Sequence, residues 1–425
     1  MLKIYDPISA NQCILKRKPL DEFKLHETTA NQLAALFGEP LSADQAVARI
    51  ISDIRKDGDN ALRKWSEKLD GNTSGSLRVS EAELTNALAG IPATQREALE
   101  LAAQRIRSFH QRQPMTSWMT QDLGGTLGQL IRPIRRVGIY VPAGSAPLPS
   151  SVLMSAIPAQ VAGVSEIALV TPPDRASGKI SPIILAAAAL IGLNEVYAIG
   201  GAQAIAALAF GSESISAVDK IFGPGNIFVT LAKRQVFGVV GIDTLAGPTE
   251  TMIIADETAR AQWLAADMLA QAEHDPLASA ILLTPSPSLA EAVRDEVSIQ
   301  MATLSRLEII NISFQQRSGI VLTQDLDQAI SMANQYGAEH LCLAVADPWR
   351  WSQKVTCAGG IFLGEHSFEV LGDYVAGPSH VMPTGGSARY ASPLNVLDFV
   401  HIISVIALDP KTAVQISPAA AAIAR

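Results

Sequence analysis

An adjacent pair of residues, Glu339 and His340, carries side chains suited to acid–base chemistry near neutral pH. Such a pair offers one group that exchanges a proton and one that orients it or activates water. The pair precedes the apolar run Leu341–Val345, a predicted strand. Because adjacent strand residues point to opposite faces, both side chains reach one substrate only from the loop before that strand, which Gly337 favours. The pair alone equally fits a helix-end carboxylate beside a packed histidine.

Two further segments contain residue types that bind metals. Gln271 and His274 lie three residues apart near the end of a predicted helix, so their side chains share one face. Residues 372–386, expected to form a long irregular loop, contain Asp373 and His380. Asp, His and Gln together suit zinc with oxygen and nitrogen ligands. Taken alone, however, a histidine on a helix is more often a packed or surface residue, and glutamine is a weak ligand.

Three glycine-rich turns follow predicted strands and open predicted helices, so their backbone amides could bind an anion. They are residues 141–150, 200–203 and 222–226. None of them contains G-x-G-x-x-G, so the turns do not by themselves establish a dinucleotide site. Glycine used for tight turns and close helix packing explains each turn equally well.

The candidate residues lie in two series of alternating predicted strands and helices, the pattern of parallel α/β layers. The first series runs from a strand at 137–141 to one at 220–222. The second begins after Gly247 and includes a strand predicted at 308–312. Before both series, residues 20–112 have helical periodicity. The sequence therefore predicts two α/β units with helical end segments.

One helix of the N-terminal part is defined closely by its pattern. Apolar residues at three- and four-residue spacing predict a helix over 43–56, with Ser42 as its N-cap. Asp57 and Gly58 interrupt the pattern, which resumes as far as Leu69.

Composition limits the class of protein. The chain has 425 residues, 48% hydrophobic, and a net charge of −8, which argues against disorder and against nucleic acid or an anionic membrane as partner. Its apolar runs are too short to span a bilayer, and its start does not resemble a signal peptide. The three cysteines are widely spaced without a CxxC, which is typical of a reducing compartment. We therefore expect a cytoplasmic enzyme acting on a small molecule.

Six segments, in their order along the chain, resemble the histidinol dehydrogenase family, and the likeness runs from about Asp21 to Phe399. They are GGAQAIAALAFG (200–211), KIFGPGN (220–226), AGPTE (246–250), QAEHDP (271–276), GAEHL (337–341) and GDYVAGPSHVMPT (372–384). The resemblance implies an α/β fold with two incomplete Rossmann-like domains and small end segments, in an intertwined homodimer that uses NAD and zinc. The family binds NAD without the glycine fingerprint.

The resemblance also implies a division of the chain. Residues 1–30 form an N-terminal extension that contacts the partner subunit. Residues 31–118 and 251–392 form the first α/β domain, with the zinc and acid–base residues. Residues 119–250 form the second, NAD-binding domain. Residues 393–425 form a short C-terminal segment, truncated relative to the family.

Residues that match family motif positions take the following implied roles. The NAD-contacting positions are Tyr140, Gln203 and Asn226. The zinc ligands from one subunit are Gln271, His274 and Asp373. The substrate-contacting positions are Thr249, Gln271, His274, His340, Asp373 and His380. The acid–base pair is Glu339 and His340.

The implied reaction is the last step of histidine biosynthesis. L-Histidinol is oxidised through L-histidinal to L-histidine, and each step passes a hydride to NAD. His340 would take the alcohol proton, and Glu339 would activate the water that adds to the aldehyde. Zinc would position the imidazole and amine of the substrate.

Some positions depart from the family pattern. Thr249 stands where serine is usual, and Ser379 stands where asparagine is usual. The family normally continues into a segment whose Glu and His reach the partner's site, whereas this sequence ends at Arg425. Two alternatives therefore stay open: a related enzyme that oxidises another small alcohol, and a catalytically weak or silent zinc-binding dimer.

Overall fold

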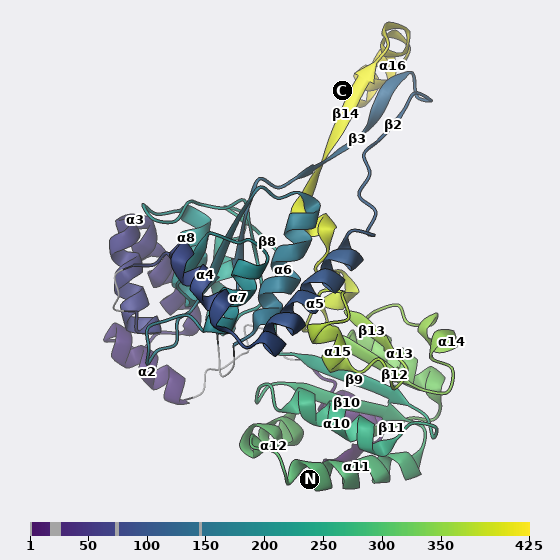
Figure 1. The fold of residues 1–425 in the computed structure, drawn as a ribbon. Coiled ribbons are helices and arrows are strands. Elements are labelled where there is room, and N and C mark those ends of the chain that lie inside the picture. Colours follow the sequence, from purple (N-terminus) through teal and green to yellow (C-terminus); the bar gives the residue numbers. More distant parts are fainter. Residues whose placement is uncertain (1, 18–26, 73–75, 144–146) are drawn as a thin grey trace.

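A computed structural model describes residues 2–17, 27–72, 76–143 and 147–425. Figure 1 shows two separate β-sheets flanked by helices and a long β arm that extends away from them. Both of these sheets are parallel throughout, which confirms the two predicted α/β units. No described helix has the length and apolar character needed to cross a bilayer.

The first sheet has five strands in the order β6-β5-β4-β7-β8. Its strands are β4 (Arg136–Tyr140), β5 (Glu166–Thr171), β6 (Val196–Ala198), β7 (Lys220–Phe222) and β8 (Gly241–Ile242). The helices between them are α6 (Pro149–Ala162), α7 (Pro182–Leu190), α8 (Gly201–Phe210) and α9 (Ile227–Val236). Helix α6 forms despite Pro158 in its interior.

The second sheet has six strands in the order β1-β11-β10-β9-β12-β13. Its strands are β1 (Ile4–Tyr5), β9 (Glu250–Ala255), β10 (Ser279–Thr284), β11 (Gly319–Leu322), β12 (His340–Ala344) and β13 (Gly360–Leu363). One face packs against α10 (Ala261–Ala272), α11 (Pro287–Met301) and α12 (Leu307–Gln316). The other face packs against α1 (Pro7–Gln12) and α13 (Leu326–Tyr336), and α14 (Pro348–Ser352) lies beside β12 and β13.

The packing differs from the expected domain division in two places. The helices of 31–118 pack mainly on the five-stranded sheet, because their apolar side chains belong to its hydrophobic clusters. Arg105 also donates hydrogen bonds to the backbone of Val375 and Ala376 in the segment 251–392. These helices are α2 (Glu27–Phe37), α3 (Ala43–Asp70), α4 (Glu81–Gly90) and α5 (Ala93–His110). In addition, β1 of the N-terminal extension pairs with β11 of its own chain. Residues 1 and 18–26 of that extension lie outside the described residues.

Helix α3 begins and bends where the sequence predicted. The hydroxyl of Ser42 accepts a hydrogen bond from the Gln45 backbone amide at 3.2 Å, and the side-chain oxygen of Gln45 accepts one from the Ser42 backbone amide at 2.9 Å. The helix is kinked at Gly58, which has φ 50° and ψ −129°, a conformation that side chains disfavour. A Cβ at this position would lie 2.6 Å from the Glu213 carboxylate.

Gly58→Ala should therefore lower the free energy of unfolding by about 2 kcal/mol, measured from urea midpoints. Gly90→Ala is the matched control, because a Cβ at Gly90 meets nothing within 4 Å at the end of α4. It should leave stability unchanged or slightly raised. Equal midpoints for the two variants would contradict the role of the kink.

Two local predictions from the sequence are wrong. The predicted strand at 308–312 is part of α12, because Ile310, Ser313 and Phe314 share one buried helical face and this spacing outweighs the β-branched composition. The segment expected to be an irregular loop, 372–386, begins inside helix α15 (Glu369–Tyr374). Asp373 is therefore held on a helix.

The arm is an antiparallel sheet of three strands, β14-β3-β2. They are β2 (Trp118–Thr120), β3 (Gly125–Pro133) and β14 (Val400–Leu408). Helix α16 (Pro410–Ile423) follows at the tip of the arm (Figure 1). Two short 3₁₀ turns, Ser387–Arg389 and Val396–Phe399, precede β14 in the chain. Chain segments far apart in sequence thus build one extension.

Candidate active site

A cleft of about 830 Å³ lies between the two parallel sheets. The five-stranded side contributes Pro142 and Asn226, from the loops that follow β4 and β7. The six-stranded side contributes His274, Glu369 and Asp373. The cleft therefore joins residues from both α/β units.

The two sheets present opposite ends to this site. In the five-stranded sheet the loops after the strands approach the cleft, as is usual in α/β proteins. In the six-stranded sheet, the amino ends of β9 and β12 carry the polar residues: Thr249 directly precedes β9, and His340 begins β12. Glu339 lies in the loop directly before β12. This agrees with the expectation that the side chains of Glu339 and His340 can approach each other only if the pair lies at the start of the strand.

Three carboxylates surround the imidazole of His340, which is 3% exposed. Its Nε2 lies 3.3 Å from Asp373 Oδ1. Its Nδ1 lies 3.7 Å from carboxylate oxygens of both Glu339 and Glu369. Burial disfavours the charged imidazole, but the charges of Glu369 and Glu339 outweigh it and raise the pKa of His340 to about 10.

Glu339 is a buried carboxylate held at one oxygen. Its Oε2 accepts a hydrogen bond from the Thr249 hydroxyl at 2.7 Å and from the Glu250 amide at 3.1 Å. Burial raises the pKa of Glu339 to about 7, although the charge of His340 and these hydrogen bonds act in the opposite direction. A carboxyl group with such a pKa can accept a proton from water near neutral pH.

The hydroxyl of Thr249 links the acid–base pair to Gln271. Gln271 is 1% exposed, and its Nε2 donates to the Thr249 hydroxyl at 2.8 Å. Its Oε1 is buried and has no hydrogen-bond partner among the described residues. A buried acceptor without a donor is costly, so this oxygen fits a metal ligand. Its companions in the predicted zinc set, His274 and Asp373, line the cleft.

Glu369 is a site residue that the sequence analysis missed. Ligand atoms of His340, Glu369 and Asp373 lie within 4.8 Å of one another, a second grouping able to hold a metal ion. Glu369 and Asp373 are four residues apart on α15 and so share a helix face. The four-residue spacing from Asp373 would have indicated Glu369 as a site residue if residues 369–374 had been predicted to be a helix.

His380 lies at the border between the two α/β units. Its Nε2 is 3.3 Å from the Ser151 hydroxyl on α6. Burial lowers the pKa of His380, against the opposing charge of Asp373. A neutral imidazole in contact with both units is suited to hydrogen bonding with a substrate in the cleft.

The three residues matched to NAD positions lie on the five-stranded side. Asn226 lines the cleft and caps α9 by accepting hydrogen bonds from Phe228 and Val229, at 3.0 and 3.2 Å. Behind it, the Tyr140 hydroxyl accepts from the Gly201 amide at 3.2 Å. Gln203 is fully buried and donates to Asp70 at 3.0 Å. Residues 144–146 of the adjacent glycine-rich turn lie outside the described residues.

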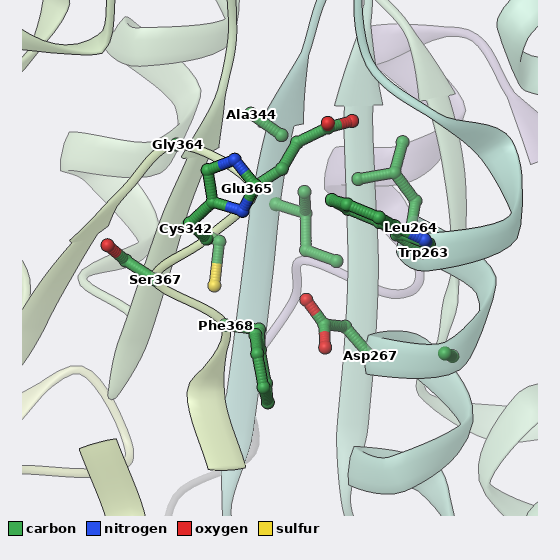
Figure 2. Close-up of a pocket in the computed structure, with 12 residues that line it drawn as sticks. Trp263, Leu264, Asp267, Cys342, Ala344, Gly364, Glu365, Ser367 and Phe368 are labelled. Atoms are coloured by element: carbon green, nitrogen blue, oxygen red, sulfur yellow. The ribbon is translucent and has the colours of Figure 1, made fainter. Parts of the chain in front are cut away.

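A smaller pocket of about 270 Å³ lies between α10 and the segment before α15. Figure 2 shows the Asp267 carboxylate in this pocket, with Trp263, Cys342 and Phe368 around it. Burial, and after it the charge of Glu369, raise the pKa of Asp267 to about 7. Helix α10 thus carries Asp267 into this pocket and Gln271, one turn later, to Thr249.

Comparison with known proteins agrees with this architecture. A family model described as histidinol dehydrogenase matches residues 39–425. The chain is 47% identical to the histidinol dehydrogenase of Deinococcus radiodurans over 96% of this chain and 93% of that protein. It is 49% identical to that of Dehalococcoides mccartyi strain CBDB1 over 97% and 93%. The crystal structure of histidinol dehydrogenase from Elizabethkingia anophelis matches with a TM-score of 0.89 and 37% identity, over 98% of this chain and 93% of that one.

Proposed function

Because the chain belongs to the histidinol dehydrogenase family, an oxidoreductase family of histidine biosynthesis, we propose that it oxidises L-histidinol to L-histidine with two molecules of NAD. The observation that carries this proposal is the cluster of Glu339, His340 and Gln271, which the Thr249 hydroxyl links. The cluster adjoins the cleft through Asp373, a cleft residue that contacts His340. The cleft lies between the sheets, where one side can hold substrate and the other a cofactor.

In the first half of the reaction, the neutral form of His340, which becomes populated as the pH approaches its pKa of about 10, takes the hydroxyl proton of the alcohol. A hydride leaves the same carbon, which gives the aldehyde. In the second half, Glu339 takes a proton from water as that water adds to the aldehyde carbon. At the same time protonated His340 gives its proton to the carbonyl oxygen, which completes the hydrate. The hydrate then loses a second hydride, and His340 accepts the proton of its hydroxyl group, to give the carboxylic acid. Thr249 holds one oxygen of Glu339 in place throughout.

Gln271 Oε1, His274 and Asp373 fit a zinc ion, because their donor set is oxygen and nitrogen and the Gln271 oxygen is otherwise buried without a partner. When bound, zinc supplies a Lewis acid that orients the imidazole and amine of the substrate. On the opposite wall, Asn226, Tyr140 and Gln203 are the residues that would hold NAD. NAD would accept both hydrides.

The proposal is tested with purified protein, zinc, NAD and L-histidinol, by following NADH absorbance. Two NADH per L-histidinol are expected, because the oxidation takes four electrons. Turnover of another small alcohol but not of L-histidinol would instead indicate a related enzyme of different specificity. Bound zinc without any turnover would indicate a silent member of the family.

The β arm supports a homodimer. The arm and helix α16 at its tip expose apolar side chains far from the body, including Ile402 (57% exposed) and Ile406 (72%) on β14 and Val414 (75%) on α16. A narrow antiparallel sheet with exposed apolar side chains is unstable in water unless another surface covers it. The arm protrudes from the rest of its own chain (Figure 1), so a second copy is the surface we propose.

Ile406→Glu should therefore convert a dimer to monomers in sedimentation velocity, because it places a charge in the contact. Ile299→Glu is the matched control: Ile299 is 65% exposed but lies on α11, away from the arm. That variant should sediment as the wild-type dimer. A dimer that survives Ile406→Glu unweakened would contradict the arm contact.

A further inference from the structure

Glu369 is a buried carboxylate to which the proposed reaction assigns no role. It is the first residue of α15 and is 6% exposed. Its Oε2 accepts a hydrogen bond from the hydroxyl of Thr251, in β9. Because this bond ties the carboxylate to the sheet, the direction of the other oxygen, Oε1, is fixed. That oxygen lies 3.7 Å from Nδ1 of His340.

The Nδ1 atom of His340 needs a hydrogen-bond partner. It is buried and has none among the described residues. Glu339 is equally near, but its facing oxygen already accepts from Thr249 and from the Glu250 amide. Within the described chain, Oε1 of Glu369 accepts no hydrogen bond. Nδ1 of His340, which lacks an acceptor, thus faces Oε1 of Glu369, which lacks a donor.

We propose that Glu369 is a positioning residue that accepts the Nδ1 proton of His340 and leaves Nε2 as the atom that takes the substrate proton. A carboxylate behind an imidazole fixes both its tautomer and its orientation. Nε2 lies 3.3 Å from Oδ1 of Asp373, which lines the cleft, so this nitrogen is directed toward the cleft. This inference rests on the proposed function, since it requires His340 to be the base.

In this arrangement Glu339 and Glu369 have different roles. Glu339 keeps its hydrogen bonds to Thr249 and Glu250 and does not have to hold the imidazole. Glu369 holds the imidazole from the α15 side, and Thr251 holds Glu369. The competing assignment is Glu369 as a metal ligand, because it belongs to the group of His340, Glu369 and Asp373. Zinc content distinguishes the two assignments.

The test uses the full-length, zinc-loaded protein with Glu369→Ala. We expect kcat for L-histidinol to fall about 10- to 100-fold, with KM within about 3-fold of wild type and zinc content unchanged. Added formate should restore part of kcat, because it can occupy the vacated carboxylate position. Thr251→Val should cause a smaller loss. Asp256→Asn removes another buried carboxylate, which directly follows the carboxyl end of β9, and should change neither kcat nor the response to formate.

Glu369→Gln provides a second variant of the same size. Its amide has one acceptor oxygen for two donors, Thr251 and Nδ1, so kcat should again fall while zinc and KM are retained. Zinc loss in these variants would overturn the proposal in favour of a metal ligand. An unchanged kcat, a change confined to KM, or a loss in Glu369→Ala that formate does not restore would also overturn it. An inactive wild type, or His340→Gln with full activity, would instead refute the proposed function.

Discussion

Replacement of His340 by glutamine should lower kcat for L-histidinol oxidation by about 10²- to 10⁴-fold, because the imidazole that takes the alcohol proton is removed. Glutamine has similar size and polarity, so the buried site keeps its shape. The measurement is the steady-state rate of NADH formation at saturating NAD. Zinc content and the unfolding temperature of the same sample show whether the loss is chemical.

Glu339→Gln is the contrast within this experiment. This variant keeps His340, the base for the alcohol, but loses the carboxylate of Glu339 that activates water. The number of NADH formed per L-histidinol should therefore fall from two toward one as the aldehyde accumulates. In the wild type, protonation of Glu339 below its pKa of about 7 should slow the aldehyde half of the reaction. His366→Gln is the control, because His366 lies in the smaller pocket beside Trp263. If the His340→Gln variant of the first experiment kept wild-type activity, His340 would not be the base that takes the alcohol proton.

The sequence predicted the α/β class and most elements because their signals are local. Alternating strands and helices, the Ser42 cap and the break at Gly58 each depend on residues within one or two turns. The helix α12 was missed because its β-branched residues favour a strand locally, while its buried face is set by packing on the six-stranded sheet. Which sheet the helices of 31–118 cover is likewise a long-range property.

The sequence named candidate residues for the site but not their arrangement. Motif positions pointed to Glu339, His340 and Gln271 one by one, and the structure places them in one cluster, with the Thr249 hydroxyl between Glu339 and Gln271. Glu369 was missed because its role depends on Thr251 and His340, which are distant in sequence. Nor does a motif reveal that the six-stranded sheet offers the amino ends of its strands, since the general rule points to the other edge.

Removal of either predicted zinc ligand from the cleft wall should empty the metal site. Gln271→Ala and His274→Ala each delete one donor of a set that has no thiolate, so purified protein should contain well under one zinc per subunit. Zinc should also stop raising the unfolding temperature of these variants. In the wild type, free zinc at about 100 times its dissociation constant would add about 2.7 kcal/mol to the stability of the folded state.

Glu273→Gln is the matched control for both variants. Glu273 lies between the two predicted ligands in sequence and also lines the cleft, but it belongs to no ligand set proposed for this site. It should keep wild-type zinc content and the zinc-dependent rise in unfolding temperature. If Gln271→Ala and His274→Ala both retained full zinc while Glu369→Gln lost it, the metal would belong to the group of His340, Glu369 and Asp373. His340 would then be a ligand and not the base, because a nitrogen bound to zinc cannot also take the substrate proton.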